Sequence, residues 1–307
     1  MILRVGAAQL GPPSPSPGEA ADRMTALVSQ AADAGARLVA FPELAFTDYF
    51  PKRPFPGVEA SRPLFQQLPD DATAGLFAEA DKLGVSLIVP FAEWADGQRY
   101  NAALLWEAGS GPAGVYRKVH TPHPVEFAPG QTNAYESDWF AAGTNFPTFE
   151  LAGTQVGVQI CFDRHFPEST RCLALKGAQV VFICSNSQSY GKPWRAEVWD
   201  MICRIRAYEN TVFIVGVNKT GIEDGEVDWH GRSCIVSPLG KIIAQAGNDG
   251  RDGVIVADLD LADVKAERRT RRFLEERRPE AYAALIEPIS PASSRRQTPA
   301  ASSHAHT

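Results

Sequence analysis

The sequence has no long apolar run and no secretory signal pattern. A membrane-spanning helix needs about 20 consecutive apolar residues, and no apolar run among the 307 residues approaches that length. The chain enters a strand-like pattern at Ile2, without the basic and then apolar stretch of a signal peptide. We therefore expect a cytoplasmic protein that has no membrane partner.

Cysteine is scarce and shows no pairing pattern. No C-x-x-C pair occurs, and the number of cysteines is odd, which argues against a closed disulfide framework. Several cysteines lie inside apolar runs, as free thiols do in a reducing compartment. We expect neither disulfides nor a zinc site from the cysteines at positions 161, 172, 184, 203 and 234.

Positive charge is not in excess either. The net charge of −6 argues against a non-specific nucleic-acid binder. We interpret the arginine- and glutamate-rich run 267–278 as a solvated helix face or a charged dimer contact. No linker divides residues 1–287, so we expect one domain there. Ser, Pro, Ala, Thr and His dominate residues 288–307, which predicts a disordered C-terminal tail without a metal site.

Apolar strands alternate with helical patterns along most of the chain. This alternation, with hairpin-like pairs of strands, predicts an α/β fold with an antiparallel portion. Residues 119–145 resist assignment, and an irregular segment of this length is usually a binding loop or lid. We expect strands at 2–9, 37–41, 85–91, 99–106, 114–117, 147–160, 179–184, 211–218, 234–237, 241–245 and 253–257, and helices at 18–34, 71–83, 167–177, 195–209 and 261–287.

Cys161 lies where a strand ends and a helix begins. Residues 156–160 form an apolar run, and Pro167 and Glu168 suit the first turn of a helix. The positive end of that helix would stabilise a thiolate. An isolated cysteine is more often a small buried apolar residue, so the rest of the chain must decide between these interpretations.

Two other strands end in ionisable residues. Glu43 follows the strand that ends at Phe41, and Lys118 follows the strand that ends at Arg117. Groups at the carboxyl ends of strands in an α/β sheet line one crevice. Glu43 would take the thiol proton of Cys161 there, while the Lys118 ammonium would lower the thiol pKa and stabilise an oxyanion. Taken singly, each could equally be an ordinary surface residue.

The three strand ends together resemble the signatures of the nitrilase, or carbon–nitrogen hydrolase, superfamily. The similar stretches are Phe41–Glu43, Tyr116–His120 and Cys161–Glu168, with later segments at 206–210 and 231–240. The resemblance spans roughly residues 2–285. It implies a four-layer αββα sandwich that pairs into an αββααββα dimer, or a homotetramer.

The resemblance also implies roles for particular residues. Glu43 would be the general base, Lys118 the oxyanion stabiliser and Cys161 the nucleophile, with the backbone N–H of Phe162 as a second oxyanion donor. A second glutamate in the long loop would orient the lysine or position water. Glu136 matches it best, and Glu126 is the alternative.

Within the superfamily, the chain is most similar to N-carbamoyl-D-amino-acid hydrolases. That similarity implies that Arg164 pairs with a substrate carboxylate, because a guanidinium fork suits a planar carboxylate. It also implies that Asn186, Ser187 and His120 line the pocket, although each could instead order a loop. His165 stands where a second arginine is usual, and an Arg-His pair is reminiscent of N-carbamoyl-β-alanine hydrolases.

We therefore expect a cofactor-free, metal-free amidohydrolase that converts an N-carbamoyl amino acid, with N-carbamoyl-D-amino acids favoured, to amino acid, ammonia and carbon dioxide. Its partner would be a small carboxylate-bearing molecule rather than nucleic acid. The alternatives are an N-carbamoyl-β-alanine amidohydrolase, an N-carbamoylputrescine amidase, an aliphatic amidase and, in a different class, a non-catalytic scaffold. A nitrile-hydrolysing relative fits the motifs less well.

Overall fold

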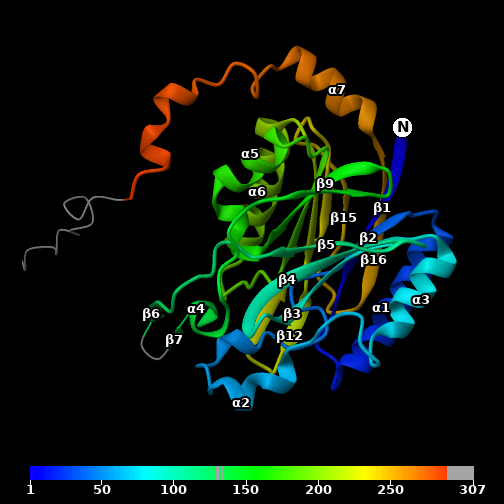
Figure 1. Cartoon of the computed structure of the whole chain (residues 1–307), viewed down its shortest axis with the longest axis vertical. Coiled ribbons are helices and arrows are strands. Elements are labelled where there is room, and N and C mark those ends of the chain that lie inside the picture. The colour runs from blue at the N-terminus through cyan, green and yellow to red at the C-terminus, as the bar shows by residue number, and fades with distance from the viewer. Residues whose placement is uncertain (129–130, 133, 289–307) are drawn as a thin grey trace, which may run out of the picture.

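Two six-stranded sheets stack face to face in the computed structural model, which describes residues 1–128, 131–132 and 134–288 (Figure 1). The first sheet has the strand order β16 (Gly253–Asp260), β1 (Ile2–Gln9), β2 (Leu38–Ala40), β3 (Ser86–Ala95), β4 (Gln98–Glu107), β5 (Gly111–Arg117). The second has the order β15 (Ile242–Gln245), β14 (Cys234–Val236), β11 (Phe213–Asn218), β10 (Val180–Ser185), β9 (Thr154–Ile160), β8 (Thr148–Leu151).

Alternating side chains of the strands form the core between the sheets. Leu3, Val5 and Ala7 of β1 point into it and meet residues of the second sheet such as Val158 and Phe182. Successive side chains of a strand point to opposite faces. The other face of each sheet must therefore be covered by a further layer.

Helices supply that layer on both sides. α1 (Pro17–Asp33) and α3 (Ala74–Leu83) cover the first sheet, and α5 (Pro167–Leu175) and α6 (Trp194–Asn210) cover the second (Figure 1). Gly157 lets α5 approach closely, since a Cβ there would lie 2.8 Å from Leu173 Cδ1. The predicted four-layer αββα sandwich is confirmed. Among the described residues, no helix has the length and apolarity required to cross a membrane.

The shorter elements lie outside the four layers. The described residues of segment 119–145 contain little regular structure, in agreement with the irregular sequence pattern. The α-helical and β elements outside the layers are α2 (Val58–Ser61), α4 (Glu136–Trp139), α7 (Leu261–Thr270), β6 (Glu126–Ala128), β7 (Gln131–Thr132), β12 (Thr220–Glu223) and β13 (Val227–His230), and 3₁₀ turns occur at Phe50–Lys52, Arg62–Leu64, Cys161–His165, Pro279–Ala281 and Ala283–Leu285. Of these elements, α7 lies at the opposite end of the sandwich from α2, α4 and β12 (Figure 1).

Two predicted elements are wrong in extent. Residues 147–160 form a hairpin of β8 and β9 rather than one strand, because Ala152 and Gly153 take left-handed conformations with φ of 51° and 75°. The predicted helix 261–287 ends at Thr270. Beyond Thr270, Leu274 packs against the core of the α5–α6 layer. This contact does not require α7 to continue in a straight line. The predicted disordered tail lies almost entirely outside the described residues.

Helix α6 buries a different face from the apolar one in its sequence. The sequence places Val198, Met201, Ile202, Ile205 and Tyr208 on one side. The structure instead buries another set against the sheet, and Met201 and Ile205 remain 62% and 43% exposed. The buried residues of α6 are Trp199, Cys203, Arg206, Ala207 and Asn210.

Strand directions bring the predicted site residues to one edge of the sandwich. β1, β2 and β3 are parallel, and β5 runs in the same direction as β3 because both are antiparallel to β4. β9, β10 and β11 are likewise parallel. The segments that follow β2, β5, β9 and β10 therefore meet at the carboxyl ends of the strands, as expected for α/β sheets.

Candidate active site

Lys118 lies between two carboxylates in the interior of the protein. Its Nζ is 2.8 Å from Glu43 Oε1 and 2.5 Å from Glu136 Oε2, and neither Lys118 nor Glu43 has any exposed surface. Glu126, the alternative second glutamate, is exposed on β6. The structure therefore brings Glu136, rather than Glu126, to the lysine.

Electrostatics keep this lysine protonated. Burial alone would lower the pKa of Lys118, but the two carboxylates outweigh burial and raise it above its ordinary value. Removing one partner from such a cluster would leave a buried charge uncompensated. The ammonium is thus a fixed positive charge at the end of β5.

Neighbouring polar groups fix the orientation of both carboxylates. Asn101 of β4 donates from Nδ2 to Glu43 Oε1 at 2.7 Å, and the Asn186 backbone N–H donates to Glu43 Oε2 at 3.2 Å. The Tyr49 hydroxyl donates to Glu136 Oε1 at 2.5 Å. Sequence reasoning missed Tyr49 and Asn101, since neither adjoins a motif and their partners come from distant segments.

A sharp backbone turn presents Cys161 at the end of β9. Cys161 has a φ of 43°, in the left-handed region that costs a non-glycine residue about 1–3 kcal/mol. The buried carboxylate of Asp163 holds the turn by accepting from Ile160 N at 3.0 Å, and it also accepts from the Tyr116 hydroxyl at 2.6 Å. The turn is a 3₁₀ segment, and α5 begins only at Pro167. The helix thus begins at the predicted residue, and Cys161 lies in the turn that precedes it.

The thiol of Cys161 contacts Arg164 and a backbone carbonyl. Arg164 Nη1 lies 3.3 Å from Sγ, and the Asn186 carbonyl oxygen lies 3.8 Å from it. Burial and the nearby Glu43 carboxylate raise the pKa of the thiol, although Arg164 and Lys118 oppose them. The expectation of a depressed pKa is therefore wrong. A thiol with a raised pKa needs a base to take its proton during attack.

A cavity of about 400 Å³ opens above the thiol. Its wall carries the cations Arg164, Lys192 and Arg195, whereas the only carboxylate that the described residues place on it is Glu136, which is paired with Lys118. Aromatic rings supply much of the remaining wall. The lining residues include Tyr49, Cys161, Phe162, His165, Asn186, Ser187, Tyr190, Trp194 and Trp229.

The comparisons with known proteins agree with this geometry. The family model for carbon–nitrogen hydrolases matches residues 4–269. The chain belongs to the carbon–nitrogen hydrolase family. It is therefore a hydrolase of carbon–nitrogen bonds other than peptide bonds.

Individual relatives differ in the substrates that their names state. The chain is 34% identical to an N-carbamoylputrescine amidase of Solanum lycopersicum over 67% of this chain and 70% of that protein. It is 30% identical to an omega-amidase of Xenopus tropicalis over 84% and 91%. A carbon–nitrogen hydrolase from Helicobacter pylori G27 superposes with a TM-score of 0.83 at 27% identity, covering 94% of this chain and 99% of that one.

Five of the six predicted substrate-binding residues of this hydrolase line the cavity. Arg164 and Ser187 are joined by a 3.0 Å hydrogen bond from Nη2 to Oγ. Both polar side-chain atoms of Asn186 are buried and hydrogen-bond to no described residue. Phe162 and His165 lie on the same wall, and burial together with three nearby arginines lowers the pKa of His165.

His120 does not line the cavity. Its Nδ1 lies 2.8 Å from Asp163 Oδ1, and its ring stacks on Phe166 with centroids 3.7 Å apart. Its backbone N–H also donates to Asp163 at 3.0 Å. His120 thus connects the segment after Lys118 to the turn that holds Cys161. This is the loop-ordering role that the sequence left open as the alternative to lining the pocket.

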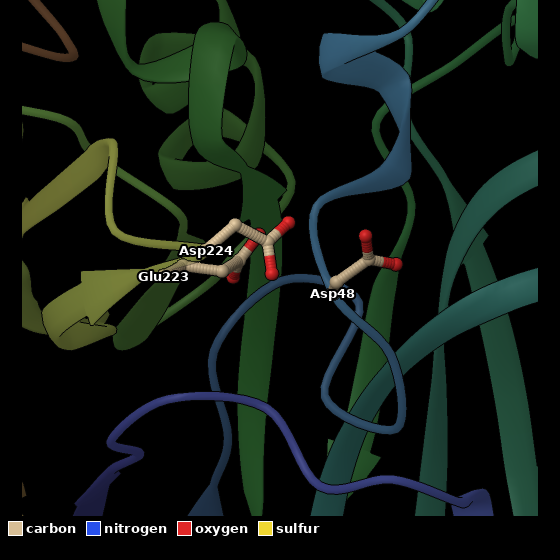
Figure 2. Close-up of side chains that lie close together, drawn as sticks. All are labelled: Asp48, Glu223 and Asp224. Carbon is tan, nitrogen blue, oxygen red and sulfur yellow. The ribbon is translucent and has the colours of Figure 1, made fainter.

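Figure 2 shows the one cluster of potential metal ligands among the described residues. The carboxylates of Asp48, Glu223 and Asp224 come from two segments, and their nearest oxygens lie within 4.8 Å of one another. Lys52 bonds Glu223 at 3.0 Å and Asp224 at 2.6 Å, and Arg53 bonds Asp48 at 2.6 Å. Because these cations neutralise the cluster, it is better described as an ion-pair network.

Proposed function

We propose that this hydrolase cleaves the carbamoyl C–N bond of N-carbamoyl amino acids, with N-carbamoyl-D-amino acids as the first candidates. One observation carries the proposal. The Cys161 thiol, with Glu43 and Lys118 behind it, lies on a cavity to whose wall the described residues contribute three cations and no unpaired carboxylate. Complementary charge selects substrates chiefly by repelling the wrong sign, so this wall favours an anionic substrate.

In the first half of the proposed reaction, Cys161 attacks the carbamoyl carbon. The S–C bond forms as Glu43 takes the thiol proton, and the Lys118 ammonium and the Phe162 N–H stabilise the tetrahedral oxyanion. Glu43 then returns the proton to the leaving nitrogen, and the C–N bond breaks. The carbonyl group, which still carries the second nitrogen, remains attached to sulfur as an S-carbamoyl thioester, that is, a thiocarbamate.

In the second half, water replaces the leaving amine. Glu43 takes a proton from water as the oxygen attacks the thioester carbon, and the S–C bond breaks with return of a proton to the thiol. When the amino acid leaves first, the carbamic acid that is released decomposes to ammonia and carbon dioxide. No redox step occurs, so no cofactor is required.

The buried amide of Asn186 suits a carbamoyl group. Its oxygen accepts and its nitrogen donates, and neither atom has a partner among the described residues. A ureido group presents N–H donors beside a carbonyl acceptor. Pairing the two would satisfy polar atoms that are otherwise costly to bury.

Ammonia release from a matched panel of substrates tests the proposal. The panel contains N-carbamoyl-D- and L-amino acids, N-carbamoyl-β-alanine, N-carbamoylputrescine and neutral amides. We expect kcat/KM for the best N-carbamoyl amino acid to exceed that for N-carbamoylputrescine by at least about 100-fold, because a cationic tail would face the cationic wall. Preference for the putrescine derivative would reject the proposal.

Sequence similarity favours a second candidate. The 34% identity to the Solanum lycopersicum protein supports an N-carbamoylputrescine amidase. Its cationic substrate would need an acidic partner in the pocket, and Glu136 is already paired with Lys118. N-carbamoyl-β-alanine and aliphatic amides are further alternatives, and the same panel separates them. A catalytically silent scaffold would release no ammonia from any member.

We also propose that two copies associate through the α5–α6 layer, in a cytoplasmic setting. The exposed apolar residues of α6, together with Leu175 and Phe273, support this face as the contact. An antiparallel or two-fold pairing there would produce the αββααββα arrangement. The five free thiols support a reducing compartment.

A further inference from the structure

Arg195 presents to the cavity a guanidinium that has no acidic partner among the described residues. Its Nε donates to the Gln188 carbonyl at 2.8 Å, and its guanidinium lies 4.7 Å from the centroid of the Tyr190 ring. These two contacts fix the plane of the group. Within the described part of the chain, the two terminal nitrogens donate no hydrogen bond, so a planar fork remains available.

Arg164, the arginine predicted to bind a carboxylate, is already occupied. Its Nη1 donates to the Cys161 carbonyl at 2.7 Å and contacts Sγ, and its Nη2 donates to the Ser187 hydroxyl at 3.0 Å. The side chain is only 4% exposed. To make a bidentate contact with a substrate carboxylate, Arg164 would have to give up its hydrogen bonds to the Cys161 carbonyl and the Ser187 hydroxyl.

The position of Arg195 in its helix runs against helix electrostatics. It occupies the second residue of α6, where the positive end of the helix disfavours a cation by about 0.3–1 kcal/mol. Lys192 precedes it and faces the same cavity. Residues that break a local rule tend to mark functional sites, and among the residues that the structure describes this group of positive charges faces no free carboxylate on the cavity wall.

We propose that the terminal nitrogens of Arg195 bind the substrate's carboxylate, while Arg164 remains on Cys161 and positions the thiol. This inference rests on the proposed function. It assigns recognition of the anion to Arg195 and support of the nucleophile to Arg164. Arg195 then determines specificity for a carboxylate, and Tyr190 and Trp194 form the aromatic wall beside it.

The test compares Arg195→Gln with wild type on a matched pair of substrates. One is the best N-carbamoyl amino acid of the panel, and the other is the N-alkylurea of the same skeleton without the carboxylate. We expect KM for the anionic substrate to rise about 30-fold with kcat within about threefold, because a charge-assisted bidentate contact is lost. We expect kcat/KM for the alkylurea to stay unchanged.

Three further variants sharpen the result. Arg195→Lys keeps the charge and loses the fork, so its KM should fall between those of wild type and Arg195→Gln. Arg204→Gln removes an exposed cation from the same helix outside the cavity and should leave KM and kcat unchanged for both substrates. Arg164→Gln should lower kcat for both substrates, since Arg164 touches the sulfur.

Equal effects of Arg195→Gln on both substrates, or no effect on either, would overturn the inference. A wild-type enzyme that cleaves amides but not ureas would reject the proposed function alone. The comparison would then use the half-amide of a dicarboxylic acid against a neutral amide of equal length. Lack of preference for the anionic member in both pairs would reject the carboxylate site as well.

Discussion

At the scale of single residues, the reactivity of Cys161 is set by opposing neighbours. Burial and Glu43 raise its pKa, and Arg164 and Lys118 lower it by a smaller amount. The resting group is therefore a thiol held near Glu43, the base that we propose for it. This arrangement differs from a preformed thiolate, in which the proton has already left before substrate binds.

The thiol's ionisation gives a pH prediction. Because the pKa of Cys161 lies above its ordinary value of 9.0, the thiolate fraction should keep increasing with pH beyond that value. We expect the rate of alkylation by iodoacetamide at Cys161, followed by mass spectrometry of its peptide, to show no plateau up to pH 9.

Glu43→Gln provides the control for this experiment. Removing the carboxylate removes one cause of the raised pKa, so the alkylation profile should shift to lower pH. A plateau in the wild-type protein near pH 6, or a profile that Glu43→Gln leaves in place, would contradict the assigned electrostatics.

The residues that the sequence identified share one property. Glu43, Lys118 and Cys161 each follow a strand closely, so strand prediction and the family resemblance located them together. Tyr49 and Arg195 could not be found in this way, because neither closely follows the end of a strand, and the partner of Tyr49, Glu136, lies far away in the sequence. The thiol pKa was also mispredicted, since burial around Cys161 is a property of the packed structure.

At the scale of elements, the turn after β9 decides where the nucleophile points. Asp163 joins this turn to β5 through the Tyr116 hydroxyl and to the following loop through His120. The left-handed Cys161 is tolerated because these contacts hold the turn on both sides. The turn and the end of β5 thus behave as one support for Cys161 and Lys118.

Asp163→Asn should weaken this support. An amide replaces one accepting oxygen with a donor that faces other donors, so we expect a loss of about 1–3 kcal/mol in the free energy of unfolding. Because small displacements of a reacting group are costly, kcat should fall about 100-fold. Urea unfolding and ammonia release measure the two effects.

Asp249→Asn, at an exposed ion pair, is the matched control and should change neither the free energy of unfolding nor kcat. A fall in stability with kcat unchanged would show that Asp163 supports the fold without positioning Cys161.

Element boundaries show where sequence patterns are insufficient. The apolar periodicity in the sequence of α6 correctly predicted a helix. However, the apolar side chains that form this pattern lie on the outer face of the helix and not against the sheet. The predicted helix 261–287 stops at Thr270, because the packing of Leu274 against the α5–α6 layer outweighs local helix preference. Tertiary packing decided both outcomes, and one sequence does not display it.

At the scale of the whole molecule, the sandwich has one edge that carries the candidate active site and one apolar outer layer. The site lies at that edge because the carboxyl ends of the parallel strands meet there, and the sequence predicted this well. The outer layer of α5 and α6 exposes large apolar residues that a single copy leaves in water. The proposed pairing would bury them.

A charge placed in this layer should separate the copies. We expect wild-type protein to elute as a dimer in size-exclusion chromatography with light scattering, and Met201→Asp/Ile205→Asp to elute as a monomer, because an unpaired buried carboxylate is costly. Ile222→Asp replaces an exposed apolar residue of β12 and should leave the dimer intact. A monomeric wild-type protein would refute the proposed pairing.

The most direct test of the central claim is ammonia release from an N-carbamoyl amino acid by wild type and Cys161→Ala, with circular dichroism to verify the fold. The proposed mechanism predicts release by wild type and a loss of at least about 1,000-fold in the variant, since no other group can form the thioester. A folded Cys161→Ala variant that still releases ammonia at a comparable rate would contradict it.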